Sequence, residues 1–376
     1  MSGGDFSMLL IGALLPSFFL SAAIGFVVRR NAASWGLVDE PGGHKSHTRV
    51  VPLGGGLAIA AAVLITFALA QFVLYFGVTN DIVRDRIPEF AKFHIDGLWA
   101  STRSLWTILG AGLVLMALGL VDDLRGVNWR IRLVVQLVVA VTCIYLEGWQ
   151  LTAFIPYPGL TTLLTALWIV TLINAFNMLD NMDGLSGGVA TTAAVVLAVT
   201  MLTPPYAEST GPQIFVGGFC LVLAGAVLGF LVHNAPPAKL FMGDAGSYFV
   251  GFCLAIGTLQ GTYANYDALP THAVLTPICI MAIPLYDLCS VIVVRLYQGR
   301  SPFEGDNQHF SHRLVQLGLS RSRAVCVICV ASTICGAAGV VLRWVSGLQA
   351  ILIAVVLLMV LVAIALAELR ASRSRC

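Results

Sequence analysis

Long apolar runs alternate with short polar segments along almost the whole chain. Eleven runs are long enough to be membrane-spanning helices, because a bilayer core of about 30 Å takes roughly 20 residues of α-helix. They cover residues 8–28, 53–78, 105–121, 131–147, 161–177, 186–203, 214–232, 248–266, 273–295, 323–344 and 348–368. The pattern predicts an all-α polytopic membrane protein with about eleven transmembrane helices, forming a single domain over residues 1–376.

The composition supports this prediction. The chain is 58% apolar and 11% charged, with a mean hydropathy of +0.89, whereas soluble domains carry about 25% charged residues. The first run has no basic segment before it and no small-residue cleavage site before Arg29, so we expect a retained helix rather than a signal peptide. The nine cysteines are scattered and are expected to pack as small apolar side chains.

The basic residues are distributed unequally over the two ends of these helices. If the N-terminus lies outside, the outer loops hold only five of the 21 Lys and Arg residues, namely Arg84, Arg86, Lys92, Arg103 and Arg343. Inner loops of membrane proteins are enriched in Lys and Arg. We therefore expect the N-terminus outside, the C-terminus in the cytoplasm, and the protein in the inner (cytoplasmic) membrane.

With this orientation, every unusual polar cluster lies on the cytoplasmic side. The clusters cover residues 39–56, 119–126, 174–188, 233–247 and 304–313. The outer connections are mostly short, and the mixed-charge segment 79–104 is expected to be a solvated loop or a short surface helix. A transporter would need polar residues near the bilayer midplane, usually on broken helices in related halves, and the sequence shows neither. The one-sided distribution favours a catalytic face.

Two clusters place acids at the membrane edge, where a charged side chain costs a few kcal/mol. Asp122 and Asp123 follow an apolar run directly. They could form a solvated helix end, but two adjacent like charges are also typical of a cation site. The second cluster repeats every three residues, at Asn174, Asn177, Asp180 and Asp183. On a helix, successive members would be neighbours, so we expect a polar stripe that faces a water-filled cleft.

Two further clusters combine acidic, basic and aromatic residues. Asp244 lies in a glycine-containing segment just before an apolar run, with Phe241 nearby for stacking, and a simple cytosolic turn explains this segment poorly. His309 and His312 are followed by Arg313. Such a His pair is more often structural, but Arg binds phosphate oxygens bidentately and His can donate a proton, so the segment also fits an anion clamp.

Basic residues after the first run complete this inventory. Lys45 and His47 could serve only as a positive-inside anchor, or they could meet an anionic lipid headgroup. Across the five clusters, carboxylate and amide oxygens are the hard ligands that select Mg²⁺ or Mn²⁺. The reaction class that fits is phosphoryl transfer at the inner membrane surface, where catalysis is mostly positioning and charge neutralisation.

The motifs and their order resemble the polyprenyl-phosphate N-acetylhexosamine-1-phosphate transferases. The chain shows KSH at 45–47, GLVDD at 119–123, NxxNxxDxxDG at 174–184, FMGDAGS at 241–247 and a His-containing loop at 309–313. The resemblance covers about residues 35–320, which leaves the runs from 323 to 368 as C-terminal helices. It implies transfer of a sugar 1-phosphate from a UDP-N-acetylhexosamine to undecaprenyl or another polyprenyl phosphate, with release of UMP and a need for Mg²⁺ (or Mn²⁺). It also implies a role in the first membrane step of cell-envelope polysaccharide synthesis, such as that of O-antigen, with no nucleic-acid partner.

The resemblance also implies a role for each motif residue. Asp122 would be the catalytic carboxylate nearest the lipid phosphate, with Asp123 beside it, and Asp180 and Asp183 would be paired acids near the nucleotide and metal. The implied metal ligands are Asp244, Asp183 and Asp123. The implied substrate-binding residues are Lys45, His47, Asn174, Asn177, Asn234, Phe241 and Arg313. His309 and His312 would act in catalysis, beside the diphosphate and sugar.

Three positions depart from the family pattern. Asn181 replaces a glycine between the two acids, Ser311 takes the third place of the common His-x-His-His loop, and His44 stands where an arginine commonly precedes the lysine.

The preferred donor is UDP-N-acetylglucosamine. The consecutive His-His-His of the phospho-MurNAc-pentapeptide translocases is absent, and eleven runs with a basic tail are more similar to the UDP-GlcNAc group. A MurNAc-pentapeptide donor, a UDP-GalNAc-type donor and, from another class, transport of an anionic substrate are the alternatives. The many small residues permit a homodimer but do not require one.

Overall fold

The computed structural model describes residues 3–39, 50–87, 92, 94–151, 155–203, 211–263, 270–302 and 308–373. The long helices are α1 (Gly3–Asn31), α2 (Gly55–Thr79), α6 (Thr102–Arg125), α7 (Trp129–Glu147), α8 (Pro158–Leu179), α9 (Leu185–Leu202), α10 (Ile214–Asn234), α11 (Gly243–Gln260), α13 (Ala282–Tyr297), α15 (Arg321–Val341) and α16 (Gly347–Arg373). The short ones are α3 (Asp81–Arg86), α5 (Ile95–Ala100), the 3-10 helix η1 (Thr271–Leu275), α12 (Thr276–Ile280) and α14 (Phe310–Gln316). The strands β1 (Val38–Asp39) and β2 (Val51–Pro52) form an antiparallel ribbon that pairs Val38 with Pro52 and Asp39 with Val51.

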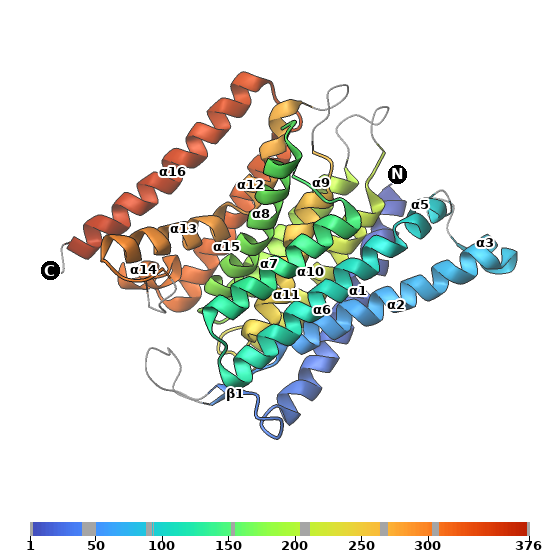
Figure 1. Ribbon diagram of the computed structural model, residues 1–376, viewed down its shortest axis with the longest axis horizontal. Helices are drawn as coiled ribbons and strands as arrows, with labels where there is room; N and C mark the ends of the chain where they lie inside the picture. Colours follow the sequence, from blue (N-terminus) through green and yellow to red (C-terminus); the bar gives the residue numbers. More distant parts are fainter. Residues whose placement is uncertain are drawn as a thin grey trace.

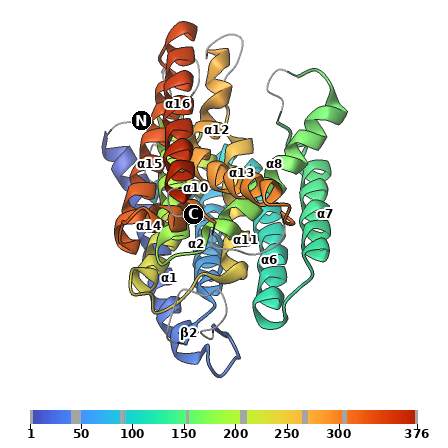
Figure 2. The ribbon, with the colours of Figure 1, turned by 90° about the vertical axis from the view of Figure 1, so that its left-hand side faces the viewer.

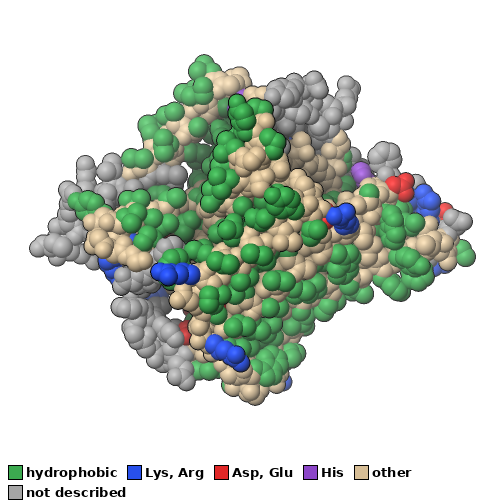
Figure 3. Space-filling view, viewed as in Figure 1, with side chains coloured by type: hydrophobic (Ala, Val, Ile, Leu, Met, Phe, Trp, Pro, Cys, Tyr) green, Lys and Arg blue, Asp and Glu red, His purple; other side chains and the backbone are tan. Residues whose placement is uncertain are grey.

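The helices are those of a polytopic membrane protein, as the apolar runs predicted. Among the described residues, eight helices are long and apolar enough to cross a membrane: α1, α2, α6, α7, α8, α9, α10 and α15. Counting η1–α12 and α13 as one bent span gives nine. Each of the eleven expected runs falls on a helix, but α11 and α16 fall outside this set, so the number eleven is not confirmed. The outer surface fits a lipid environment, since apolar side chains cover the face shown in Figure 3 and charged ones are scattered.

Two sequence-based expectations need correction. The run 273–295 is not one helix, because η1–α12 and α13 are bent by 66° around Met281. Pro277 and Pro284 lie on either side of that break, and a proline disfavours helical continuity through the residues before it. α11 covers Gly243–Gln260 rather than 248–266, so Asp244 lies in its first turn and not in a loop. Within the segment 79–104, the short helices α3 and α5 agree with the expected surface helix.

Arg343 lies in the turn between α15 and α16, as expected, but it is buried there. Its side chain is 1% exposed, and its guanidinium donates to the carbonyl oxygens of Thr200 and Thr203 at the end of α9. The last four carbonyls of an α-helix have no partner within the helix, so they stabilise a buried cation at this end. Arg343 therefore joins the ends of α9 and α15 instead of meeting solvent.

Helix α11 is the centre of the bundle, and residues Ala245 to Thr258 are all buried. It packs against α2, α6, α8, α9 and α10. Glycines allow the closest contacts: a Cβ at Gly56 would lie 2.2 Å from the backbone nitrogen of Gly246, and one at Gly119 would lie 2.4 Å from that of Ala245. Small residues let backbones approach in this way in membrane proteins. Gly119 thus brings the end of α6 against the start of α11.

The helix ends that carry the polar clusters meet at one end of the bundle, here called the site end, where β1 is labelled in Figure 1 and β2 in Figure 2. The backbone N–H groups of Gly55 and Gly56 donate to the carbonyls of Phe241 and Met242, and that of Phe241 donates to Pro52. These bonds join the start of α2 and the ribbon to the start of α11. The predicted one-sided arrangement of the clusters is therefore present in the described part of the chain.

Candidate active site

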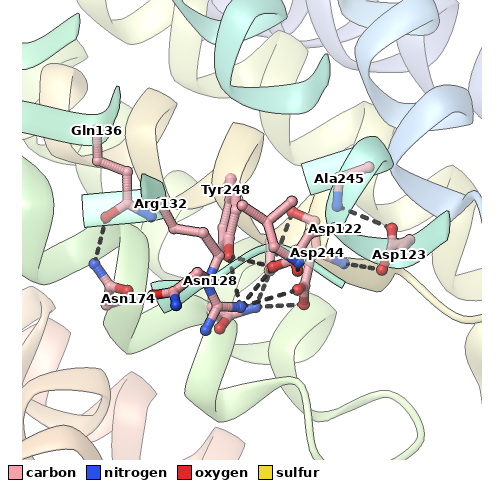
Figure 4. A network of polar contacts seen from close by, with 12 residues as sticks. Asp122, Asp123, Asn128, Arg132, Gln136, Asn174, Asp244, Ala245 and Tyr248 are labelled. Atoms are coloured by element: carbon pink, nitrogen blue, oxygen red, sulfur yellow. Dashed lines mark hydrogen bonds and ion pairs between the residues drawn. The ribbon is translucent and has the colours of Figure 1, made fainter. Parts of the chain in front are cut away.

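Asp122 is held in place by three hydrogen-bond donors. Its Oδ2 accepts from the Arg132 guanidinium at 2.5 Å and from the Tyr248 hydroxyl at 3.1 Å, and its Oδ1 accepts from the Val127 N–H at 2.7 Å. The Asp122 side chain is only 6% exposed. Arg132 also lies 3.6 Å from an Asp244 carboxylate oxygen, so one guanidinium faces two acids from different helices (Figure 4).

Asp123 has a different environment from its neighbour. Its two carboxylate oxygens accept from the backbone N–H groups of Asp244, at 2.9 Å, and Ala245, at 3.2 Å (Figure 4). Because the first N–H groups of a helix have no partner within it, Asp123 caps α11 from α6. Gly243, at φ +72°, allows this contact, since a Cβ there would lie 2.6 Å from Asp123 Oδ2. This cap explains why α11 begins earlier than its apolar run.

The asparagines of the predicted stripe contact different helices. The Asn177 amide donates to Asp244 Oδ1 at 2.6 Å and to the Ser247 hydroxyl at 3.1 Å. The Asn174 amide donates to Gln136 of α7 at 2.7 Å, as Figure 4 shows. Asn177 therefore belongs to the acid site, whereas Asn174 joins α8 to α7 beside it.

The acids of the stripe are not on the helix, which corrects the expectation of four neighbours on one helical face. α8 ends at Leu179, and Asp180 and Asp183 lie in the turn before α9. An Asp183 oxygen accepts from the Ala238 N–H at 2.9 Å, which joins the turn to the segment between α10 and α11. Burial and, secondarily, the charge of Asp123 raise the pKa of Asp180 to about 7.

Asn234 fixes the two loops on either side of the site. Its side-chain oxygen accepts from the Gly184 N–H at 2.8 Å, and its amide donates to the Leu240 carbonyl at 2.9 Å. The side chain is 3% exposed. Both the oxygen and the nitrogen of the Asn234 side chain are thus bonded to backbone groups of the protein. Asn234 would therefore influence nucleoside binding by fixing the shape of these two loops. Phe241 is half-buried between the ribbon and α11, and Lys45 and His47 lie outside the described residues.

The His-containing segment is attached to α13. His309 Nδ1 lies 2.9 Å from Asp287 Oδ2, and the Phe310 N–H donates to Asp287 Oδ1 at 2.6 Å. Arg313 donates to the Ser290 hydroxyl at 2.7 Å. The rings of His309 and His312 are 6.2 Å apart between centroids. His309, His312 and Arg313 therefore lie together at the start of α14, beside α13.

Two of the positions that depart from the family pattern contact each other. The Ser311 hydroxyl donates to the Asn181 side-chain oxygen, and the Asn181 amide donates to the Met178 carbonyl at 2.8 Å. Ser311 is 1% exposed. The contact joins α14 to the turn that carries Asp180 and Asp183. The His segment and the acid cluster are consequently parts of one site.

Comparison with known proteins identifies the family. The model described as glycosyl transferase family 4 matches residues 105–262. A decaprenyl-phosphate N-acetylglucosaminephosphotransferase of Mycobacterium tuberculosis is 32% identical over 321 residues, covering 80% of this chain and 74% of the relative. The chain belongs to this family. An undecaprenyl-phosphate alpha-N-acetylglucosaminyl 1-phosphate transferase of Yersinia pestis is 30% identical over 342 residues, covering 87% of this chain and 83% of the relative. A probable undecaprenyl-phosphate N-acetylglucosaminyl 1-phosphate transferase of Bacillus subtilis is 29% identical over 343 residues, covering 89% of this chain and 85% of the relative.

The acid site of this family 4 protein fits a cation that is completed by substrate. Among the described residues, no three His, Cys, Asp or Glu side chains lie close enough to hold a metal ion together. The expected ligand trio of Asp244, Asp183 and Asp123 is thus not assembled, since Asp123 caps α11 and Asp183 accepts from a loop amide. Mg²⁺, however, is usually bound by one or two carboxylates plus substrate phosphates. The Asp244 side chain is 31% exposed, so its carboxylate can be reached from outside the bundle.

The sequence-based site omitted three residues that the structure of this family 4 member brings into contact with it. Arg132 was counted only as an inner positive charge, and Tyr248 only as part of an apolar run. Asp287 also lies in an apolar run, and its side chain is fully buried. An ionisable residue within a membrane helix is by default a functional candidate, so Asp287 could have been found by that signal.

Proposed function

We propose that this family 4 member transfers N-acetylglucosamine 1-phosphate from UDP-N-acetylglucosamine to a polyprenyl phosphate and releases UMP. The names of its relatives supply the sugar phosphate and the lipid acceptor. The observation that carries the proposal is the shared position of Arg132 between Asp122 and Asp244 at the site end. A guanidinium between acids, at the ends of apolar helices, suits a reaction in which phosphate charge is handled at the membrane surface.

The acceptor attacks directly in this proposal. An oxygen of the polyprenyl phosphate forms a bond to the sugar-proximal phosphorus, and the bond from that phosphorus to the UMP oxygen breaks. A phosphate monoester has a second pKa near 6 and is largely dianionic at neutral pH, so it scarcely needs a base. Asp122 accepts three hydrogen bonds, which hold it as a positioning carboxylate rather than a free nucleophile. Trapping of a phosphorylated Asp122 would contradict this route.

The residues that would hold Mg²⁺ are Asp244 and Asp180. When bound, the ion would neutralise the diphosphate of the donor. Asn177 orients Asp244 by donating to one of its oxygens and leaves the other facing Arg132.

The donor would extend from the acid turn toward α14. His309, His312 and Arg313 would stabilise the negative charge that develops on the diphosphate. A cavity of about 300 Å³ lies beside the turn and offers space for part of the nucleotide. It is lined by Met182, Asp183, Pro236, Pro237, Arg321, Ser322 and Val325. In the cell, the site would face the cytoplasm from the inner membrane.

The test is UMP release by the purified full-length protein in detergent, with undecaprenyl phosphate and Mg²⁺. UDP-GlcNAc, UDP-GalNAc and UDP-MurNAc-pentapeptide are supplied separately. We expect release with UDP-GlcNAc, abolished by EDTA. Asp180→Asn and Asp183→Asn are expected to abolish release while the protein still elutes as a single species in size-exclusion chromatography. Release with a different donor would change the assigned sugar, and release with none would contradict the proposal.

A further inference from the structure

Asp287 is a buried acid in an otherwise apolar part of α13. Its side chain is fully buried, and α13 lies beside α8 and α15 in the bundle. An ionised carboxylate at such a place is costly unless hydrogen bonds satisfy it. Both oxygens are satisfied by α14 and the residue before it, His309 Nδ1 on one and the Phe310 N–H on the other. The free-energy cost of burying this carboxylate is thus offset by hydrogen bonds from the His segment of the site.

The contact with Asp287 determines which ring nitrogen of His309 carries a proton. A carboxylate can only accept, so the Nδ1 atom 2.9 Å away has to be the donor. In the part of the chain that the structure describes, His309 Nε2 has no hydrogen-bond partner. A neutral imidazole held in this way presents a lone pair at Nε2.

The packing around Asp287 and His309 also fixes how α14 is oriented against α13. Ser290, one turn further along α13, accepts a hydrogen bond from Arg313, one turn further along α14. Two successive contacts therefore fix the rotation of α14 against α13. A third contact, between Ser311 and Asn181, fixes the opposite face of α14 against the acid turn. His309 can then vary little in position relative to Asp180 and Asp183.

We propose that Asp287 is a positioning residue for the transfer reaction. It holds His309 as the Nδ1–H tautomer and directs Nε2 to the diphosphate of the bound donor. This inference rests on the proposed function for its role in turnover, but the tautomer that it requires is a property of the protein alone. Asp287 itself does not touch the substrate. A residue that orients a functional histidine typically affects its chemistry strongly, as partners of metal-bound and catalytic histidines do.

The first test measures the tautomer in the wild-type protein. Full-length protein labelled with ¹⁵N-histidine is examined in detergent by two-bond ¹H–¹⁵N correlation NMR at mildly alkaline pH. The chain has seven histidines, and the signal lost in His309→Gln assigns His309. We expect the Nδ1–H form. An Nε2–H form in the wild type would overturn the proposal, whatever the behaviour of any variant.

The second test measures turnover in a double-mutant cycle. Asp287→Asn keeps the shape of the side chain, but its amide can donate to Nδ1 and so moves the ring proton to Nε2. We expect kcat for UMP release to fall roughly 100-fold, with KM changed much less. In the His309→Gln background the same substitution should change kcat less than about twofold, because the residue it positions is gone. An equal loss in both backgrounds would show that Asp287 acts through the fold and would overturn the proposal.

Ser290→Ala is the matched control on the same helix. It removes a contact to Arg313 but leaves the Asp287 carboxylate and His309 intact, so the Nδ1–H signal should persist. If the wild type releases no UMP with any donor, the proposed function fails, whereas the NMR result still decides whether Asp287 sets the tautomer. If Asp287→Asn cannot be purified as a folded species, the wild-type tautomer alone decides the matter.

Discussion

Arg132 is the residue whose removal most directly perturbs the acid site. Its guanidinium donates to Asp122 and Tyr248 and lies 3.6 Å from Asp244. Arg132→Gln keeps much of the side-chain length but removes the charge, which leaves two carboxylates facing each other. We expect the variant to be folded, less stable without divalent cations, and strongly impaired in turnover.

The size of the stability loss follows from the geometry. A hydrogen bond to a charged group contributes about 1.5–3 kcal/mol, and Arg132 makes one such bond at 2.5 Å to an acid that is 6% exposed. The second acid is too distant for a hydrogen bond and adds attraction only. Coulomb energies at short range reach about 4 kcal/mol at an effective dielectric of 20, but desolvation offsets much of this. A loss of about 2 kcal/mol is the expected result, which lowers the apparent Tm by a few degrees.

The assay is thermal unfolding in detergent, followed by intrinsic fluorescence, with EDTA and with a series of Mg²⁺ concentrations. Because the variant has lost a positive charge between two acids, Mg²⁺ should raise its Tm more than that of the wild type. Arg130→Gln is the control, since Arg130 is exposed on the same turn of α7 and its guanidinium lies 5.3 Å from the Trp129 ring centroid. Equal Tm values and equal Mg²⁺ shifts for the two variants would refute the reasoning.

Other parts of the site give further predictions. Gly119→Ala should lower the yield of folded protein sharply, because its Cβ would lie 2.4 Å from backbone atoms of α11; Gly110→Ala, with nothing within 4 Å, should not. In a double-mutant cycle, Asn181→Ala and Ser311→Ala should be non-additive by about 1 kcal/mol in unfolding free energy; additive losses would exclude coupling. Burial raises the pKa of Asp180 from 3.8 to about 7, so ionisation of Asp180 destabilises the folded state progressively as pH rises from about 4 to about 7. In EDTA, Asp180→Asn should therefore exceed the wild type in Tm at about pH 8 and by less at about pH 5.

The meeting of the polar clusters could be predicted from the sequence, because an alternation of apolar runs and short loops determines which helix ends share a side. Asp122, Asp180 and Asp244 each lie at such an end, and the structure brings all three together at the site end. The pairwise contacts could not be predicted. Asp122 and Arg132 are ten residues apart, across a turn at Gly126 with φ +67°. Whether they meet depends on how α7 packs against α6.

The departures from expectation also have local physical causes. Hydropathy averages a window of residues, so it detected neither the bend at Met281 nor the single acid Asp287 within an apolar run. The cap that Asp123 provides for α11 was equally hidden, because a cap from a distant helix leaves no local spacing to recognise. Membrane-helix patterning therefore locates the site but not the bonds that build it.

The two halves of the candidate active site differ in how many neighbouring residues constrain a substitution. Asp244 begins α11, a helix buried on all sides by five neighbours, so a change of its inner residues has to be matched by changes in several helices at once. α14 is a short helix that packs on α13 and α15 through the buried Phe310 and Leu314 and is joined to its neighbours by hydrogen bonds. Its less buried positions, His312 and Gln316, can change the outline of the proposed donor site without repacking the bundle. We therefore expect related enzymes to diversify in donor sugar through α14, while the phosphate chemistry at the start of α11 stays the same.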